Sequence, residues 1–312
     1  MLRRRTRAAL LGAVFLSGTT YGTTARAFCR TTTCDTCQQP LFGCVTDGVP
    51  LYWPTSCVGY DVQQDASVYV DLDTASRIAD AAFQAWSSVT CPASGGPPSF
   101  RPENLGPVAC DKHEYNDQES MFGGNANVIV FRDTEWTATK DPHTLALTTV
   151  TYNRSTGEIY DADIEVNSHI AETGLGGISA SDEVPPMTYD LLSILTHEVG
   201  HFLGLAHSDV ACSADGHDCP TMDAMYRAGS AEFRTLENDD AAGICAAYPA
   251  GRGTTDDSCS PRHGFSGECG SPGHKGCCST APGAASSRRS EGLYAALVGV
   301  GLLMARARRR AA

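Results

Sequence analysis

Hydrophobic residues recur along the chain with two periods, that of an α-helix and that of a β-strand. The helical period is clear in residues 75–89, whose apolar stripe is expected to pack on a sheet. Short apolar or alternating runs are typical of strands instead. Such runs are found at 57–62, 68–72, 127–131, 145–152 and 158–166. The last two flank the turn-forming sequence NRSTG and are therefore predicted to form a hairpin.

A second helix is predicted after Pro185 and Pro186, because proline is not tolerated inside a helix. We expect this helix to begin near Thr188 or Asp190, since both residues are good N-caps. Its buried side would consist of Leu191, Leu192, Leu195, Val199 and Phe202. Strands that precede this helix and a final helix predict an α+β domain with a mixed sheet.

The N-terminus differs from this pattern. Four arginines precede the apolar run 8–16, and Ala25-Arg26-Ala27 forms an AxA cleavage site. We interpret residues 1–27 as a secretory signal peptide rather than a disordered basic tail. The protein is therefore expected outside the cell or attached to its surface.

Fourteen cysteines, all of them after residue 27, fit an exported protein whose thiols oxidise. Residues 28–50 are rich in cysteine and lack periodic apolar positions, so we expect a disulfide-tied lead-in. A zinc ribbon at Cys34 and Cys37 is the alternative, but the sequence has only one CxxC. The pairings cannot be deduced from sequence, although a bond between Cys212 and Cys219 would pin the loop between them.

The net charge of the chain limits the kinds of molecule that the protein is expected to bind. Residues 28–287 hold 12 of the 23 basic residues and 35 of the 36 acidic residues, so the body of the chain is strongly negative. Nucleic acids and anionic membranes would be repelled by it. We expect no nucleic acid partner, and membrane contact only through the C-terminal segment.

The sequence HEVGHFLGLAH carries the chemistry. On a helix, His197 and His201 present both imidazoles on one face, with Glu198 beside them. A continuing helix would carry His207 away from the other two rings, so the helix must end before it. Gly204 can adopt the left-handed conformation that ends a helix. The spacing thus predicts three imidazole ligands for one metal ion, with Glu198 as general base rather than ligand.

This motif, HExxHxxGxxH, resembles that of the metzincin zinc proteases, and Ser208 after the third histidine is similar to the matrixin branch. The resemblance covers residues 51–249, strongly in the zinc segment and diffusely elsewhere. It implies a zincin domain in which a twisted mixed sheet lies beside an active-site helix and a C-terminal helix. The C-terminal helix would lie within LENDDAAGICAAYP, residues 236–249.

The resemblance also implies which residues meet a substrate. DAMYRAG is similar to the Met-turn, which implies Met225 beneath the zinc ligands and Tyr226 beside the specificity pocket. Arg227 stands where matrixins usually have proline, so the pocket wall departs from the family. The strand at 145–149 would be the sheet edge that pairs with an extended substrate, and an ordinary edge strand is the alternative. The pocket would be lined by Leu145, Ala146, Leu147 and Tyr226.

These residues predict a secreted or surface-attached zinc metalloendopeptidase that acts on protein or peptide substrates as a monomer. One Zn²⁺ held by three neutral imidazoles keeps a fourth position for water, whose proton Glu198 would take. Two alternatives stay open: a noncatalytic surface binding protein with a structural zinc, and a zinc hydrolase of another substrate. Closed structural sites use four protein ligands, and only three are evident here.

Other candidate sites are weaker. Calcium or a second ion could be held by Asp133, Asp161, Asp163 and Glu165, although most such acids face water. His143 and His169 flank acidic segments, and His217 is expected to be solvated. The sequence lacks the His and Asp pattern of the matrixin structural zinc and a PRCGVPD-type switch, so we assign neither a second zinc nor latency through a cysteine.

We divide the chain into a signal peptide (1–27), a Cys-rich segment (28–50), a matrixin-like catalytic domain (51–250), a Gly/Ser/Cys-rich linker (251–291) and a hydrophobic segment with an arginine cluster (292–312). The apolar run 293–305 is shorter than the roughly 20 residues that span a bilayer comfortably. Together with the cysteine pair and the Ser-rich spacer before it, this end resembles the C-terminal sorting tails of bacterial surface proteins, in particular the myxobacterial kind. A permanent anchor is the alternative.

Overall fold

A computed structural model describes most of the chain between residues 28 and 268. The described ranges are 28–34, 36–37, 43–117, 124–136, 141–173, 176–213 and 219–268, with two short strands near the C-terminus. The predicted signal peptide, most of the predicted sorting tail and His217 lie outside the described residues. Within the described part, no helix has both the length and the apolar character needed to cross a membrane.

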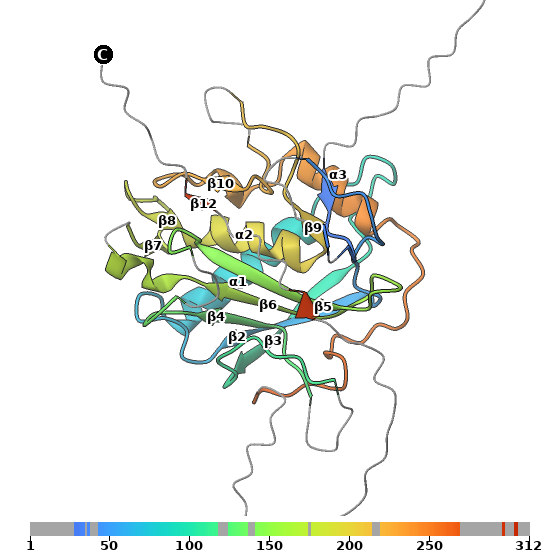
Figure 1. The fold of residues 1–312 in the computed structure, drawn as a ribbon, viewed down its shortest axis with the longest axis horizontal. Helices are drawn as coiled ribbons and strands as arrows, with labels where there is room; N and C mark the ends of the chain where they lie inside the picture. The colour runs from blue at the N-terminus through green and yellow to red at the C-terminus, as the bar shows by residue number, and fades with distance from the viewer. Residues whose placement is uncertain are drawn as a thin grey trace, which may run out of the picture.

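A mixed β-sheet forms the base of the fold (Figure 1). Its main strands are β2 (Cys57–Gln63), β3 (Arg101–Val108), β4 (Val128–Phe131), β5 (Ala146–Tyr152) and β6 (Ile159–Val166). They lie in the order β5-β6-β4-β2-β3, and β11 (Ala295–Ala296) pairs with the outer edge of β5. Neighbouring main strands are parallel except β5 and β6, which form the predicted antiparallel hairpin. The sheet agrees with the α+β class predicted from the sequence.

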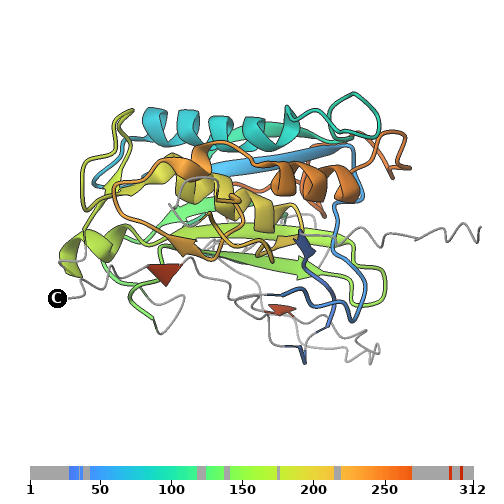
Figure 2. The same cartoon turned by 90° about the horizontal axis from the view of Figure 1, so that it is seen from above.

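Three helices pack against the strands, as the view from above shows (Figure 2). They are α1 (Leu72–Ser87), α2 (Leu191–Phe202) and α3 (Asn238–Ala247). Helices α1 and α2 contact each other along their lengths; α1 also contacts β2 and β3, while α2 contacts β5 and β6. Helix α3 adds Ile244, Ala247 and the following Tyr248 to the same core.

Short elements complete the fold. They are β1 (Cys29–Arg30), η1 (Ser168–Thr173), β7 (Ile178–Ser179), β8 (Tyr189–Asp190), β9 (Leu205–Ala206), β10 (Met225–Tyr226), η2 (Glu232–Arg234) and β12 (Leu303–Met304), where η denotes a 3-10 helix. β1 pairs antiparallel with β9, the short strand that follows α2. This pairing attaches the Cys-rich lead-in to the segment at the end of α2. The pairs β7–β8 and β10–β12 are parallel.

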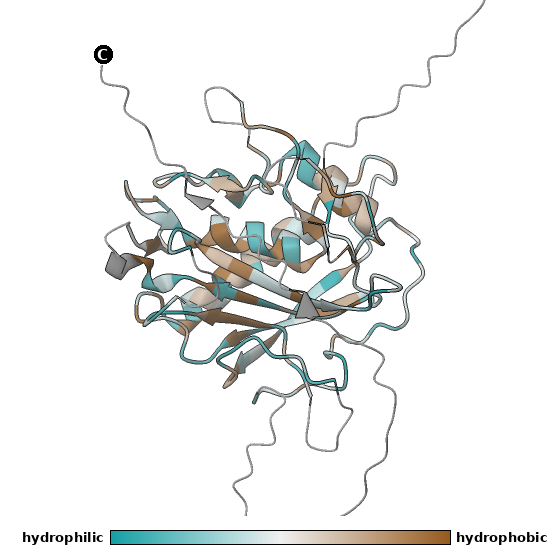
Figure 3. Ribbon diagram, in the orientation of Figure 1, coloured by the Kyte–Doolittle hydropathy of each residue, from teal (hydrophilic) through white to brown (hydrophobic). Residues whose placement is uncertain are grey.

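The alternation of side chains gives the sheet two different faces. In β6, Ala162, Ile164 and Val166 join the main core on the helix side. The intervening acidic residues of β6 therefore lie on the other side, which we call the outer face. Figure 3 shows the hydrophobic positions gathered in the strands and helices and the polar ones in the connecting loops.

Residues 68–72 do not form the predicted strand. The side chain of Asp71 accepts a hydrogen bond from the Thr74 amide at 2.9 Å and caps α1, which begins at Leu72. Val68 is 79% exposed, so its β-branched side chain has no sheet to pack on. The prediction was wrong because a helix cap outweighed local β-propensity.

Strand β3 was not predicted from the sequence. Its residues, RPENLGPV, include Pro102, Pro107 and Gly106, which argue against a strand in the middle of a sheet. β3 is the last strand of the order, however, and proline is tolerated at such an edge. Only the position of β3 in the sheet explains why this sequence forms a strand.

Five disulfides join described cysteines. They are Cys29–Cys44, Cys34–Cys37, Cys57–Cys259, Cys91–Cys245 and Cys212–Cys219. Because Cys34 and Cys37 are bonded to each other, they do not form the zinc ribbon that was the alternative for this segment. The last one closes the loop for which a bond was suggested.

Residues 251–268, which we expected to be linker, lie against the outer face of the sheet and are called the strap. Cys259 of the strap is bonded to Cys57 in β2. A Cβ placed on Gly59 would lie 2.2 Å from the Cys259 carbonyl oxygen, so the two backbones meet closely. The Asn125 side chain donates to the Arg262 carbonyl at 2.6 Å. In Figure 1 the strap is the orange segment that runs from α3 round to the strands.

Candidate metal centre

The start of α2 is fixed by the N-cap that the sequence predicts. Asp190 Oδ2 accepts a hydrogen bond from the Ser193 amide at 2.9 Å. Arg234 of η2 donates to both oxygens of the same carboxylate, at 2.8 and 2.7 Å. Because Asp190 is only 1% exposed, this bidentate pair holds the helix start in a buried position.

The end of α2 also agrees with the prediction. The helix ends at Phe202, and Gly204 has φ of +86°, in the left-handed region. A Cβ on Gly204 would lie 2.5 Å from the Leu51 carbonyl oxygen, so no larger residue fits there. The chain then turns back through β9 and brings His207 to the other two histidines.

The three predicted histidines converge. One ring nitrogen of each lies within 4.8 Å of those of the other two, and the Nε2 atoms of His197 and His201 are 3.1 Å apart. Tetrahedral zinc with bonds of 2.0–2.1 Å to nitrogen separates its ligand atoms by about 3.3 Å. The donor set therefore fits a zinc ion without large rearrangement.

Backbone carbonyls orient two of the rings. Nδ1 of His197 lies 2.6 Å from the Thr221 carbonyl oxygen, and Nδ1 of His201 lies 2.9 Å from that of Leu205. An Nδ1 that donates to a carbonyl leaves the Nε2 lone pair for a metal. Nε2 of His207 is buried and has no hydrogen-bond partner in the described part of the chain. A buried polar atom without a partner is costly, and a metal ion would satisfy it.

Burial keeps the three imidazoles neutral. Desolvation lowers the pKa of His201 to about 4 and holds the pKa values of His197 and His207 well below the usual range. The three rings also disfavour protonation of one another. Neutral imidazole is the form that coordinates a metal, so the cluster needs no proton loss at neutral pH.

Glu198 lies beside this cluster and is completely buried. Its Oε2 accepts a hydrogen bond from the Thr148 hydroxyl at 2.6 Å, whereas Oε1 has no partner among the described residues. Burial raises the pKa of Glu198 to about 8. The carboxyl group therefore offers one free oxygen next to the three imidazoles.

Two methionines follow the third histidine in the sequence. Met225, expected beneath the ligands, is half-buried in β10. Met222, which the sequence did not single out, belongs to the main core, and its Sδ would lie 2.2 Å from a Cβ on Gly200 of α2. Gly200 thus leaves room for Met222 against α2. The signal that could have identified Met222 is the glycine inside the HEVGH sequence.

A small apolar cluster, separate from the main core, adjoins the histidines. It contains Leu145, Ala146, Ile170, Tyr189, Ile194, Cys219, Tyr226 and Phe233. Three of the four predicted pocket residues are thus brought together, and Leu147 is not among them. Phe233 was not predicted; its ring stacks on that of His197 with centroids 6.0 Å apart, and it packs at a tilt against the Tyr226 ring with centroids 5.1 Å apart. No motif in the sequence marks Phe233.

The acidic residues proposed as calcium ligands fall into two groups. Glu165 forms ion pairs with Arg132 and His113, and Asp133 accepts hydrogen bonds from Ser67 and Ser168. These two carboxylates are satisfied by protein groups. Asp161 is different, because its Oδ1 is buried and has no partner within the described ranges.

Asp161 shares the outer face of the sheet with two more buried carboxylates. Asp163 accepts from the amides of Val128 and Glu114 at 2.8 and 3.1 Å. Asp61 in β2, which the sequence did not single out, is 0% exposed, and neither of its carboxyl oxygens has a partner among the described residues. Burial raises the pKa of each of these acids, and that of Asp61 reaches about 8.

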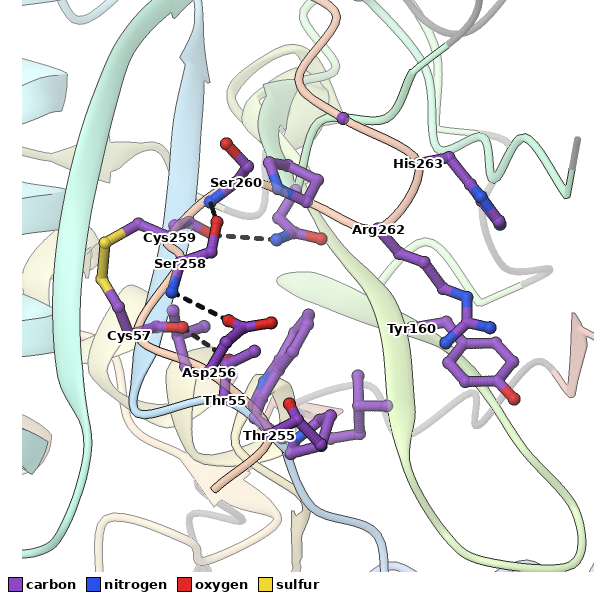
Figure 4. Close-up of a pocket in the computed structure, with 18 residues that line it drawn as sticks. Thr55, Cys57, Tyr160, Thr255, Asp256, Ser258, Cys259, Ser260, Arg262 and His263 are labelled. Carbon is purple, nitrogen blue, oxygen red and sulfur yellow. Dashed lines mark hydrogen bonds between the residues drawn. A yellow bond between two sulfur atoms is a disulfide. The ribbon is translucent and has the colours of Figure 1, made fainter. Parts of the chain in front are cut away.

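A cavity of about 370 Å³ lies away from the histidines, between the strap and the sheet (Figure 4). Arg262 of the strap stacks 4.0 Å above the Tyr160 ring at one side of it. Cys57 and Cys259 come close to Glu103 at the other side, but their sulfurs form a disulfide and are not free to bind a metal. None of the three histidines lines this cavity.

Comparison with known families agrees with this geometry. Residues 109–249 match the family model described as Matrixin. No curated protein matches the sequence. The matched range includes the three histidines, Glu198 and α3, whereas β2, α1 and β3 lie before it. Residues 109–249 are therefore similar to the matrixins, which are zinc-dependent metallopeptidases of the metzincin type.

Proposed function

We propose that the protein is a zinc-dependent metalloendopeptidase. The observation that carries this proposal is the convergence of three buried, neutral imidazoles on a point beside a carboxylate with one free oxygen. Three protein ligands leave a metal position open, which is typical of catalytic rather than structural zinc.

The ligands would be His197, His201 and His207. When bound, zinc lowers the pKa of a coordinated water and polarises the scissile carbonyl. Glu198 acts as general base: its Oε1 accepts the proton of the attacking water and then delivers it to the leaving amine. The surrounding apolar side chains exclude bulk water, which strengthens each of these interactions.

The substrate would bind as an extended peptide along β5. No strand in the described ranges pairs with the edge of β5 at Ala146–Thr149, and the substrate would add a strand along this edge. The apolar cluster around Tyr226 and Phe233 lies next to His197 and would receive a substrate side chain. Specificity would then depend on this cluster and on the exposed Arg227.

A peptide library and denatured casein test this proposal. The zinc-loaded protein should cleave internal peptide bonds, a chelator should abolish the cleavage, and added zinc should restore it. A noncatalytic zinc-containing binding protein would retain zinc and leave both substrates intact. A hydrolase of another class would also leave both intact but would act on esters or other acyl substrates in the same chelator-sensitive way.

We propose a calcium site on the outer face of the sheet at Asp161 and Asp163. Asp161 is buried, its Oδ1 has no partner in the described part of the chain, and it lines a cavity of about 270 Å³. The same cavity is lined by Glu114, Asp117, Thr149 and Thr151. Oxygen donors of this kind are those that Ca²⁺ prefers. Calcium should raise the unfolding temperature of the protein, magnesium should do so less, and Asp161→Asn should remove the effect.

We also propose that the protein is exported and either released or held at the cell surface. The support is the sequence of residues 1–27 and the disulfides, which form in oxidising compartments. N-terminal sequencing of the mature protein should begin at Phe28. Intact mass would show whether the segment 292–312 has been removed.

A further inference from the structure

Thr148 makes a direct contact with the carboxylate of Glu198. Its Oγ1 lies 2.6 Å from Glu198 Oε2 and 3.2 Å from the Glu198 carbonyl oxygen. A hydroxyl group has a single proton, and the shorter contact to the more basic acceptor takes it. Thr148 is 2% exposed and Glu198 is 0% exposed, so water does not compete for this bond.

The contact makes the two oxygens of Glu198 unequal. Oε2 is held by Thr148, and Oε1 is without a partner among the described residues. The last torsion of a glutamate side chain is broad and roughly twofold, so the carboxylate plane is not fixed by its own rotamer. A hydrogen bond to one oxygen fixes that plane and thereby the direction of the other.

We propose that Thr148 is a positioning residue for the general base. Its hydroxyl holds Oε2 of Glu198 so that Oε1 is directed at the position where the metal-bound water reacts. This inference rests on the proposed peptidase function, because it assigns Thr148 a role only through Glu198. It places part of the catalytic arrangement on the sheet edge rather than on α2.

The pairing of β5 sets the side on which Thr148 lies. Thr148 pairs with Ile164 of β6, whose side chain belongs to the main core on the helix side. The next residue, Thr149, pairs with Asp163 and lies on the outer face. A slip by one residue would exchange the two threonines, so the register of the hairpin decides which hydroxyl reaches Glu198.

Two substitutions separate the hydroxyl from the rest of the side chain. Thr148→Val keeps the volume and the β-branched shape but removes the hydroxyl, whereas Thr148→Ser keeps the hydroxyl. Thr55→Val is the matched control, because it makes the same change at a threonine whose hydroxyl donates a hydrogen bond of equal length, 2.6 Å, to the Cys57 carbonyl oxygen. Thr55 contacts neither Glu198 nor the three histidines.

Steady-state kinetics of the zinc-loaded protein give the first test. A well-placed general base contributes about 10²–10⁴-fold to the rate, so Thr148→Val should lower kcat by about 10- to 100-fold. KM should stay within about twofold, because the contact is not with the substrate. Thr148→Ser should restore most of kcat, and Thr55→Val should match the unchanged protein. An unchanged kcat in Thr148→Val would overturn the proposal.

A double-mutant cycle on the zinc-free protein gives a second test that does not depend on activity. Thr148→Val should lower the urea midpoint in the unchanged chain, because it leaves a buried carboxyl oxygen of Glu198 without its hydrogen-bond partner. In a Glu198→Ala background the same substitution should have a clearly smaller effect. Equal effects in both backgrounds would contradict the contact. If Thr148→Val does not fold, Thr148→Ala enters the same cycle.

The outcomes distinguish this inference from the proposed function. If the unchanged protein holds zinc but cleaves no peptide, the proposed function fails and the positioning role fails with it, whatever the cycle shows. If the unchanged protein cleaves peptides and Thr148→Val does so equally fast, the proposed function stands and only the role of Thr148 is lost.

Discussion

The indole nitrogen of Trp86 donates a hydrogen bond of 2.7 Å to the backbone carbonyl of Thr196, the residue directly before the first histidine. Trp86 lies in α1, before the range that matches the matrixin family model. Its ring is 0% exposed and also lies 2.8 Å from where a Cβ on Gly200 would be. Helix α2, which carries His197 and His201, therefore packs on a helix outside the matched range.

Replacing Trp86 by phenylalanine should destabilise the protein. The substitution removes the hydrogen bond and leaves a cavity, which together should lower the free energy of unfolding by about 1–3 kcal/mol. Urea unfolding measures this directly. Trp136→Phe is the control, since Trp136 is half-buried and belongs to none of the apolar clusters. Equal losses in the two variants would show that the contact with Thr196 is unimportant.

Gly200→Ala should also destabilise the protein, against helix propensity. Alanine is favoured over glycine in a helix by about 1 kcal/mol. Here the new Cβ would lie 2.2 Å from Met222 Sδ and 2.8 Å from the Trp86 ring, and overpacking of this kind costs about 1–3 kcal/mol. Thermal unfolding should show a lower midpoint. Adding Met222→Ala should recover part of the loss, and a Gly200→Ala variant as stable as the unchanged protein would argue against this close packing.

Much of the candidate site could be predicted because its determinants are local. Asp190 caps α2 and Gly204 ends it, and both roles depend on residues within one turn of the helix. The spacing of the three histidines follows from the helix and its end. The convergence of His207 on the other two was therefore predictable from the sequence.

Other features depend on distant contacts and could not be predicted. Thr148 touches Glu198 only through the packing of β5 on α2, and Phe233 reaches His197 from η2. Strand β3 forms at the edge of the sheet, where its prolines are tolerated. The strap is held by a disulfide that spans 202 residues. In these cases the partner lies far away in the chain, so no local pattern reports it.

The contribution of Asp61 to the stability should fall as the pH rises from about 4 to about 8. Burial, and then repulsion by Asp163, raises the pKa of Asp61 to about 8, whereas an unfolded aspartate titrates near 3.9. The folded protein therefore binds protons that the unfolded chain releases over this range, and the stability present below pH 4 is lost as Asp61 ionises. Asp61→Asn should flatten the pH dependence of the unfolding midpoint. If the unfolding midpoint of Asp61→Asn depends on pH in the same way as that of the unchanged protein, Asp61 does not have the raised pKa described here.

Breaking the disulfide between Cys57 and Cys259 should release the strap. A bond that closes so long a loop is expected to contribute about 5 kcal/mol, and the strap covers Gly59 and the neighbouring backbone of β2. The double variant to alanine should lose far more stability than the same change at Cys34 and Cys37, which are three residues apart. Differential scanning calorimetry compares the two. Similar midpoints for both variants would show that the strap is held by other contacts.

Zinc content and peptide cleavage, measured together on the unchanged protein and on Glu198→Ala, test the central claim most directly. Glu198 is not a metal ligand in this account, so both proteins should hold one zinc ion per chain. The unchanged protein should cleave casein, and the variant should lose at least about 100-fold of that activity, the contribution expected of a general base. Folded protein that binds no zinc, or a variant that cleaves casein as fast as the unchanged protein, would contradict the account.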